Sequence, residues 1–159
     1  MVRYTEARFP PYRYIPGEGP HPTRNPDGHS YGRELGPIVI DERSWPGCEP
    51  YLFAIDLFNH GYYWEAHEQL EAIWIGAGPD TAVGMFAQGV IQAAAALLKN
   101  TMGKHESAAR LAAAAIEKLR TNSAVLLGVD TRAFAAQLEM HLDGRRPDAP
   151  HIELRELRP

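Results

Sequence analysis

Residues Phe58-Asn-His-Gly-Tyr-Tyr-Trp-Glu-Ala-His-Glu-Gln-Leu-Glu-Ala-Ile-Trp74 decide the fold of this chain, because they combine a helix-turn-helix pattern with an unusual set of polar side chains. Gly61 is placed to end one helix, since glycine readily adopts the conformation that follows a helix C-terminus. A second helix is predicted to begin near Tyr62, with Glu65 and Gln69 on the side away from the core. Its apolar face consists of Tyr63, Ala66, Leu70, Ile73 and Trp74.

From Glu49 onward the apolar residues recur with the helical period, and helix-start and helix-stop residues mark five helices. Pro50 suits a first helical position, and Asp80 or Thr81 can cap the third helix. Short connections make consecutive helices antiparallel neighbours, so we predict an all-α fold, a compact antiparallel bundle of about five helices. The expected helices span roughly residues 50–60, 62–75, 81–99, 104–120 and 131–143.

The first third of the chain has a different composition, because nine of the thirteen prolines lie within its first 50 residues. Proline removes a backbone donor and disfavours helix in the preceding residue, so this part is expected to be non-helical. It also carries aromatic residues such as Phe9 and Tyr14, which are scarce in disordered tails. We expect an ordered, extended arm that lies on the helical body or on a neighbouring subunit. The predicted organisation is a Pro/Gly-rich arm over residues 1–48, a helical bundle over residues 49–144 and a C-terminal tail over residues 145–159.

Composition and charge argue against several classes of protein. With 159 residues, 45% of them apolar and 23% charged, the chain resembles a globular domain with one self-sufficient core. The net charge of −4 argues against nucleic acid as a partner, because phosphate contacts need clustered Lys and Arg. No uninterrupted apolar run approaches the ~20 residues of a bilayer span, so no membrane partner is expected. A single cysteine, Cys48, and the lack of a secretory signal pattern favour a cytoplasmic location.

Polar side chains of the second and third predicted helices are expected to meet. His67 and Glu71, four residues apart, share the shoulder of the apolar face, where a polar group is half desolvated. Gln88 and Gln92 repeat this spacing, and small residues beside them let another helix come close. Amides trapped in such an interface need partners, since an unpaired buried polar group costs about 1 to 3 kcal/mol. The candidate binding cluster consists of Asn59, His60, His67, Glu68, Glu71, Gln88 and Gln92.

This cluster has three interpretations. The one we favour is a hydrogen-bond network that sets the helix register. The second is the binding of a small molecule or a protein partner. The third is chemistry, either with a divalent metal ion held by His67 and Glu71 and completed by His60 or Glu68, or by acid–base catalysis at Glu71. The ferritin-like di-metal pattern is incomplete, because the Glu-x-x-Glu spacing of Glu68 and Glu71 lacks the required histidine.

A polar run in the proline-rich part is a second candidate, because a stiff loop can present histidines to a metal ion or an arginine to an anion. Turn chemistry explains the same composition, since Asn25-Pro-Asp-Gly28 is a typical turn sequence. We therefore favour a turn here over a site. The run consists of His21, Arg24, Asp27, His29 and Tyr31.

Several uncommon polar residues in register resemble a known family. They are Phe58-Asn59, Gly61, Glu65-Ala66-His67-Glu68, Glu71, Trp74, Gln88-Gly89 and Gln92. Over roughly residues 50–120 this pattern is similar to the domain of unknown function 309 family of small, all-helical bacterial and archaeal proteins. The resemblance implies an all-α bundle whose motif residues line one shared pocket or interface, and it implies no particular activity.

The functional expectation is a small helical binding or scaffold protein, with a homodimer favoured as its assembly. The alternative is a metal-dependent, hydrolase-like enzyme that uses His67 and Glu71. Access separates the two classes. A buried and fully satisfied cluster favours the scaffold, whereas an open cleft with an ordered ion or anion between the two helices favours the enzyme.

Overall fold

A computed structural model describes residues 1–155, and it confirms the predicted all-α bundle of five helices. Within these residues the strands form one small two-stranded antiparallel sheet. The elements are η1 (Trp45–Gly47), α1 (Glu49–Asn59), α2 (Tyr63–Ala77), α3 (Ala82–Thr101), α4 (His105–Thr121), β1 (Val125–Leu126), β2 (Val129–Asp130) and α5 (Thr131–Leu142).

Local capping residues set the ends of the helices, and the observed boundaries lie within two residues of the predicted ones. Thr81 caps α3, because its side-chain oxygen accepts a hydrogen bond from the backbone N–H of Gly84 at 3.0 Å. Gly61 follows α1 with a positive φ of 80°, a conformation that costs glycine little. Asp130 caps α5 in the same way as Thr81, by accepting from the N–H of Ala133 at 2.9 Å.

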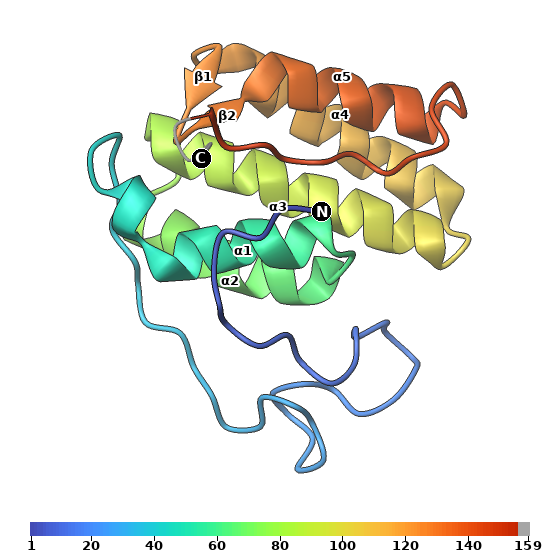
Figure 1. Ribbon diagram of the computed structural model, residues 1–159. Coiled ribbons are helices and arrows are strands. Elements are labelled where there is room, and N and C mark those ends of the chain that lie inside the picture. The colour runs from blue at the N-terminus through green and yellow to red at the C-terminus, as the bar shows by residue number, and fades with distance from the viewer. Residues whose placement is uncertain (156–159) are drawn as a thin grey trace.

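Helix α3 lies at the centre of the bundle, between the α1–α2 hairpin and the α4–α5 pair (Figure 1). Gly89 of α3 allows a close approach to α4, since an added Cβ would lie 3.2 Å from Cγ of Leu119. On the opposite side of the core, the ring of Phe58 in α1 meets that of Phe134 in α5, with centroids 5.4 Å apart. The first and last helices therefore close one continuous apolar core.

Neither the β1–β2 hairpin nor the packing of the predicted C-terminal tail against the bundle was predicted from the sequence. The hairpin turns through Leu127 and Gly128, both with positive φ. An added Cβ at Gly128 would lie 2.5 Å from the ring of buried Trp45, so glycine is required by contact as well as by conformation. Residues 145–155 then run back along the bundle and bury Ile152 and Leu154 (Figure 1). The last four residues of the predicted tail, 156–159, lie outside the described residues.

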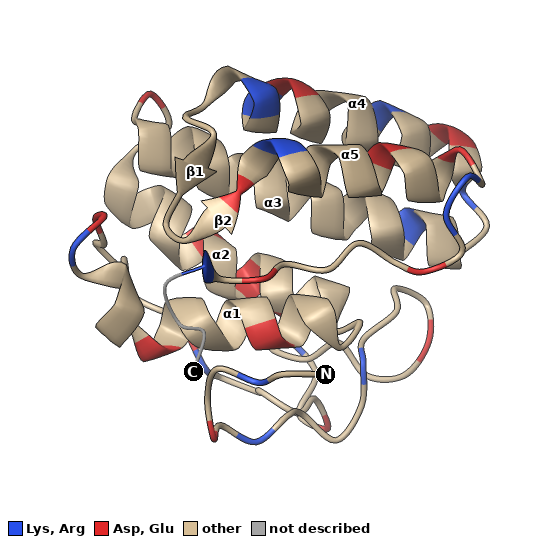
Figure 2. Ribbon diagram, turned by 45° about the horizontal axis from the view of Figure 1, so that its top comes forward, with Lys and Arg blue, Asp and Glu red and all other residues tan. Residues whose placement is uncertain are grey.

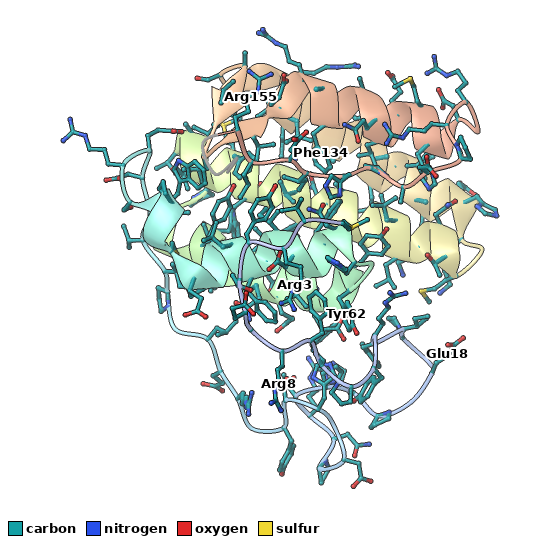
Figure 3. All side chains as sticks on the ribbon, viewed as in Figure 1. Arg3, Arg8, Glu18, Tyr62, Phe134 and Arg155 are labelled. Atoms are coloured by element: carbon teal, nitrogen blue, oxygen red, sulfur yellow. The ribbon has the colours of Figure 1, made fainter. Side chains whose placement is uncertain are left out.

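Residues 1–44, here called the N-terminal segment, contain turns and one isolated bridge and no regular helix or strand. The segment passes over α1 and then forms loops below α1 and α2 (Figure 1). Phe9 stacks on Tyr62, with ring centroids 5.0 Å apart, and Tyr14 is buried. Figure 3 places Arg3 over α1 and Arg8 farther along the segment, below that helix. The segment thus covers one face of the α1–α2 hairpin.

Gly76 is the point at which the N-terminal segment crosses α2 most closely. The N–H of Ile38 donates to the carbonyl of Ala72 at 3.0 Å, and a Cβ at Gly76 would lie 2.1 Å from the carbonyl oxygen of Ile38. Main chain cannot yield as a flexible side chain does. We expect Gly76→Ala to lower the free energy of unfolding by about 1 to 2 kcal/mol, because the clash outweighs alanine's better helix propensity.

Chemical denaturation and limited proteolysis of residues 30–41 measure this effect. Gly36→Ala is the matched control, because nothing lies within 4 Å of a Cβ there and its φ is not positive. Equal stability and equal cleavage of the two variants would contradict the tight crossing.

Charged side chains of both signs are mixed over the surface. Figure 2 shows basic and acidic residues interspersed along the N-terminal segment, α4 and α5. Helix α3 is long and apolar enough to cross a membrane by length and composition, and half of that stretch is buried inside the bundle. A core helix of a soluble protein has the same properties, so this feature is weak evidence for a membrane span.

Candidate functional site

A cavity of about 780 Å³ lies between the N-terminal segment and the α1–α2 hairpin. Its apolar lining includes Phe53 and Leu57 of α1 and Ala72 of α2. The cavity follows α2 from Trp64 to Ile75, a distance of about 17 Å at the helical rise per residue. Its volume lies within the range of small-molecule pockets, about 300 to 1,000 Å³.

Three of the seven predicted site residues meet on α2 at this cavity. The Nε2 atom of His67 lies 3.5 Å from Oε1 of Glu68 and 3.4 Å from Oε1 of Glu71. One donor atom from each of the three lies within 4.8 Å of the others, and both glutamates line the cavity. The three side chains are partly exposed, at 24%, 37% and 45% in sequence order, so solvent reaches the cluster.

The orientation of the His67 ring is set by the backbone. Its Nδ1 atom lies 2.5 Å from the carbonyl oxygen of Trp64, one turn earlier in α2. A carbonyl only accepts, so Nδ1 carries the proton and Nε2 of the neutral ring keeps its lone pair. That lone pair is on the side of Glu68 and Glu71. A histidine that donates through one ring nitrogen and ligates through the other is the usual arrangement in metal sites.

The surroundings of Glu68 change the pKa of its carboxyl group. Burial raises the pKa of Glu68 above its ordinary value, and the nearby charge of Glu71 adds to this effect. The charges of His67 and His21, when these rings are protonated, and the charge of Arg24 act in the opposite direction. Arg24 of the N-terminal segment therefore acts on the carboxylate of Glu68, and both residues line the cavity.

Aromatic rings support the start of α2 on the side of the N-terminal segment. Trp64 has Tyr14, His21 and His67 around it, each with a ring centroid 5.3 to 5.5 Å away and steeply inclined. His21 is itself oriented, because its Nδ1 accepts from the N–H groups of Thr23 and Arg24 at 3.3 Å. These contacts hold the polar run of the N-terminal segment against the helix that carries the cluster.

Glu65 is buried, although it lies on the side of α2 that faces away from the apolar core. Only 5% of its side chain is exposed, because the N-terminal segment covers that side of α2. Its Oε1 accepts from the N–H of Tyr14 at 2.8 Å and from Nε2 of His29 at 2.9 Å. Nδ1 of His29 lies 2.7 Å from Oγ of Ser30. The predicted turn is present, since the N–H of Gly28 donates to the carbonyl of Asn25 at 2.8 Å. The buried carboxylate–imidazole pair of Glu65 and His29 was not predicted from the sequence.

The second oxygen of the Glu65 carboxylate, Oε2, has no hydrogen-bond partner within residues 1–155, although it is buried. Glu65, His29 and Ser30 all line the cavity. Three arginines, Arg8, Arg24 and Arg33, line it as well, and their guanidinium groups make no hydrogen bond or ion pair within the described part of the chain.

The remaining predicted site residues have other surroundings. Asn59 hydrogen-bonds to the main chain of Ile152 in both directions, and Nδ1 of His60 contacts the carbonyl of Asp56 while its ring packs on Phe9. Gln88 and Gln92 are half-buried on α3 and do not line the cavity. Their amides make no hydrogen bond with His67, Glu68 or Glu71, and Oε1 of Gln92 is buried without a partner among residues 1–155.

The sequence carries a partial signal for what was missed. His29 belongs to the polar run of residues 21–31, and Glu65 belongs to the motif around His67. The sequence does not indicate that His29 and Glu65 meet, because 36 residues separate them. Their contact depends on how the proline-rich segment folds back onto α2.

Two comparisons with known proteins bear on these residues. The family model described as "Domain of unknown function (DUF309)" matches residues 51–111, which span most of α1, all of α2 and α3, and the start of α4. No curated protein matches the chain. His67, Glu68, Glu71 and Glu65 fall within the matched residues, whereas the N-terminal segment that completes the cavity falls outside them. The match over residues 51–111 therefore confirms the resemblance of this part of the chain to the domain of unknown function 309 family.

Proposed function

We propose that this protein binds a divalent metal ion through His67, Glu68 and Glu71 and uses it to hold a small molecule in the adjoining cavity. The observation that carries the proposal is the hydrogen bond from Nδ1 of His67 to the carbonyl of Trp64. It leaves the Nε2 lone pair on the side of two carboxylates before any ion binds. A ligand set oriented in this way needs little rearrangement.

The donor set fits a transition-metal ion. Imidazole and carboxylate together suit Zn²⁺, Mn²⁺ or Fe²⁺, and donors about 2.1 Å from a tetrahedral ion lie about 3.4 Å from one another. The Nε2 of His67 lies 3.4 and 3.5 Å from the two carboxylate oxygens. Three protein ligands leave coordination positions open to another molecule. Because Glu68 and Glu71 line the cavity, that molecule can come from there.

A metal-dependent enzyme is the second candidate, favoured by the openness of the cluster to solvent and to a cavity of ligand size. A bound ion would supply Lewis-acid chemistry at this position. The residues of the chain would bind and orient the substrate, through the apolar lining of α1 and α2 and the free guanidinium groups. Hydrolysis of model esters and phosphates by the metal-loaded protein distinguishes an enzyme from a binding protein.

Elemental analysis and calorimetry test the metal site. We expect the purified, untagged protein to bind about one Zn²⁺ or Mn²⁺ per chain. His67→Ala removes a direct ligand, so it should weaken that binding by at least about the tenfold to hundredfold that loss of a ligand's supporting hydrogen bond costs. Glu71→Gln, which keeps the shape and removes the charge, should act in the same direction. His105→Ala is the control, because His105 is exposed at the start of α4, where its Nδ1 hydrogen-bonds to the side chain of Asn100. Equal metal content and affinity in wild type, His67→Ala and Glu71→Gln would refute the assignment.

A further inference from the structure

Glu65 presents a feature that the metal site does not use. A buried carboxylate oxygen is a strong acceptor, and leaving it without a partner costs about 1 to 3 kcal/mol or more. Oε1 of Glu65 accepts two hydrogen bonds, from Tyr14 and His29, whereas Oε2 accepts none within residues 1–155. The same side chain lines a cavity of about 780 Å³. The acceptor is thus held in place by its neighbours and has one position left for a donor.

Arginine side chains line the same cavity, but they do not hydrogen-bond to Oε2 of Glu65. Arg8, Arg24 and Arg33 line the same cavity, and none of them pairs with Glu65. Nε2 of His29 already donates to Oε1, because a carboxylate can only accept. Glu65 is also not part of a group of metal-ligating side chains within the described residues. A molecule bound in the cavity can supply the donor that these residues do not.

We propose that the cavity binds a ligand with a protonated primary amine on an apolar body, and that the ammonium group donates to Oε2 of Glu65. An ammonium suits this position because it only donates, and because its charge balances a carboxylate that has no Lys or Arg partner. The body of the ligand lies against Leu57 and Ala72, which line the cavity from α1 and α2. This site does not require the metal ion.

Three probes that share one apolar chain test the proposal on metal-free protein in EDTA, so failure of the metal proposal does not affect the outcome. They are n-hexylamine, 1-hexanol and hexanoate, and calorimetry and thermal shift measure their binding at pH 7.5. We expect hexylamine to bind wild-type protein at least about tenfold more tightly than hexanol, because a charge-assisted hydrogen bond to a buried acceptor is stronger than a neutral one. Hexanoate should bind more weakly than hexylamine, and tighter binding of hexanoate, through Arg8, Arg24 or Arg33 of the same lining, would overturn the proposal.

Two variants identify the acceptor. Glu65→Gln keeps the shape of the side chain and the acceptor for Tyr14 and removes the charge, so the preference for the amine should disappear. Glu34→Gln removes one charge from an exposed side chain of the same cavity lining and should leave the preference intact. Far-ultraviolet circular dichroism checks that both variants are folded.

The comparison of probes on wild-type protein decides the matter even where Glu65→Gln is unstable. Equal binding of amine and alcohol, or no binding of the amine at millimolar concentration, would overturn the proposal and leave water as the partner of Oε2. An amine preference that survives in folded Glu65→Gln would overturn it too, since the charge would then act from elsewhere in the cavity.

Discussion

Replacing Asp56 with alanine is expected to lower the free energy of unfolding by about 3 to 5 kcal/mol, the range for breaking a buried, hydrogen-bonded ion pair. The carboxylate of Asp56 is fully buried in α1. It accepts from the backbone N–H groups of Tyr4 and Thr5 at 2.8 and 2.9 Å, and from the hydroxyl of Thr5 at 2.8 Å. Arg3 adds an ion pair at 3.7 Å. Alanine would leave two N–H donors without an acceptor and detach the first residues of the N-terminal segment from α1.

Urea denaturation followed by fluorescence measures the loss, and proteolysis near residues 3–8 reports the detachment. Glu6→Ala is the matched control, because Glu6 is an exposed carboxylate in the same part of the chain. It should change stability by less than about 0.5 kcal/mol. Similar stabilities for Asp56→Ala and Glu6→Ala would show that the carboxylate of Asp56 does not anchor the segment.

Replacing Asn59 with alanine is expected to lower the free energy of unfolding by about 2 to 4 kcal/mol. Nδ2 of Asn59 donates to the carbonyl of Ile152 at 2.8 Å, and Oδ1 accepts from the N–H of Ile152 at 2.8 Å. Both bonds are buried, so alanine leaves one main-chain donor and one main-chain acceptor unsatisfied, at about 1 to 3 kcal/mol each before relaxation. The side chain thus holds residues 145–155 against α1 and stabilises the fold.

Hydrogen exchange separates this effect from general destabilisation, because the N–H of Ile152 should lose protection before the amides of α3 do. Asn100→Ala serves for comparison, since the side chain of Asn100 makes only an exposed contact with His105. The outcome that contradicts our account is an Asn59→Ala protein with wild-type protection at Ile152.

The candidate metal cluster could be predicted from the sequence because it is local. His67, Glu68 and Glu71 lie one and four residues apart on one helix, and the helical period alone brings their side chains together. Gln88 and Gln92 show the limit of the same reasoning. Their spacing places them on one stripe of α3, but it does not determine which groups face that stripe, and their amides do not reach the three residues on α2.

Asn59 and Asp56 show a second limit. Both are polar residues of α1, and periodicity alone does not distinguish a binding residue from one that anchors the chain. Their partners lie 93 and about 50 residues away along the sequence, in stretches without regular structure. Such contacts depend on single hydrogen bonds to irregular main chain, for which no repeating pattern exists.

The sequence by itself determined the five helices, their ends and their antiparallel order, because periodicity, capping residues and short connections are local properties of the chain. Only the tertiary structure decided that the proline-rich N-terminal segment covers one face of α1 and α2. That covering buries Glu65 beside His29 and encloses the cavity. The physical reason is that an irregular segment takes its path from long-range contacts, such as those of Asp56, Glu65 and Gly76, which exist only once the helices have packed.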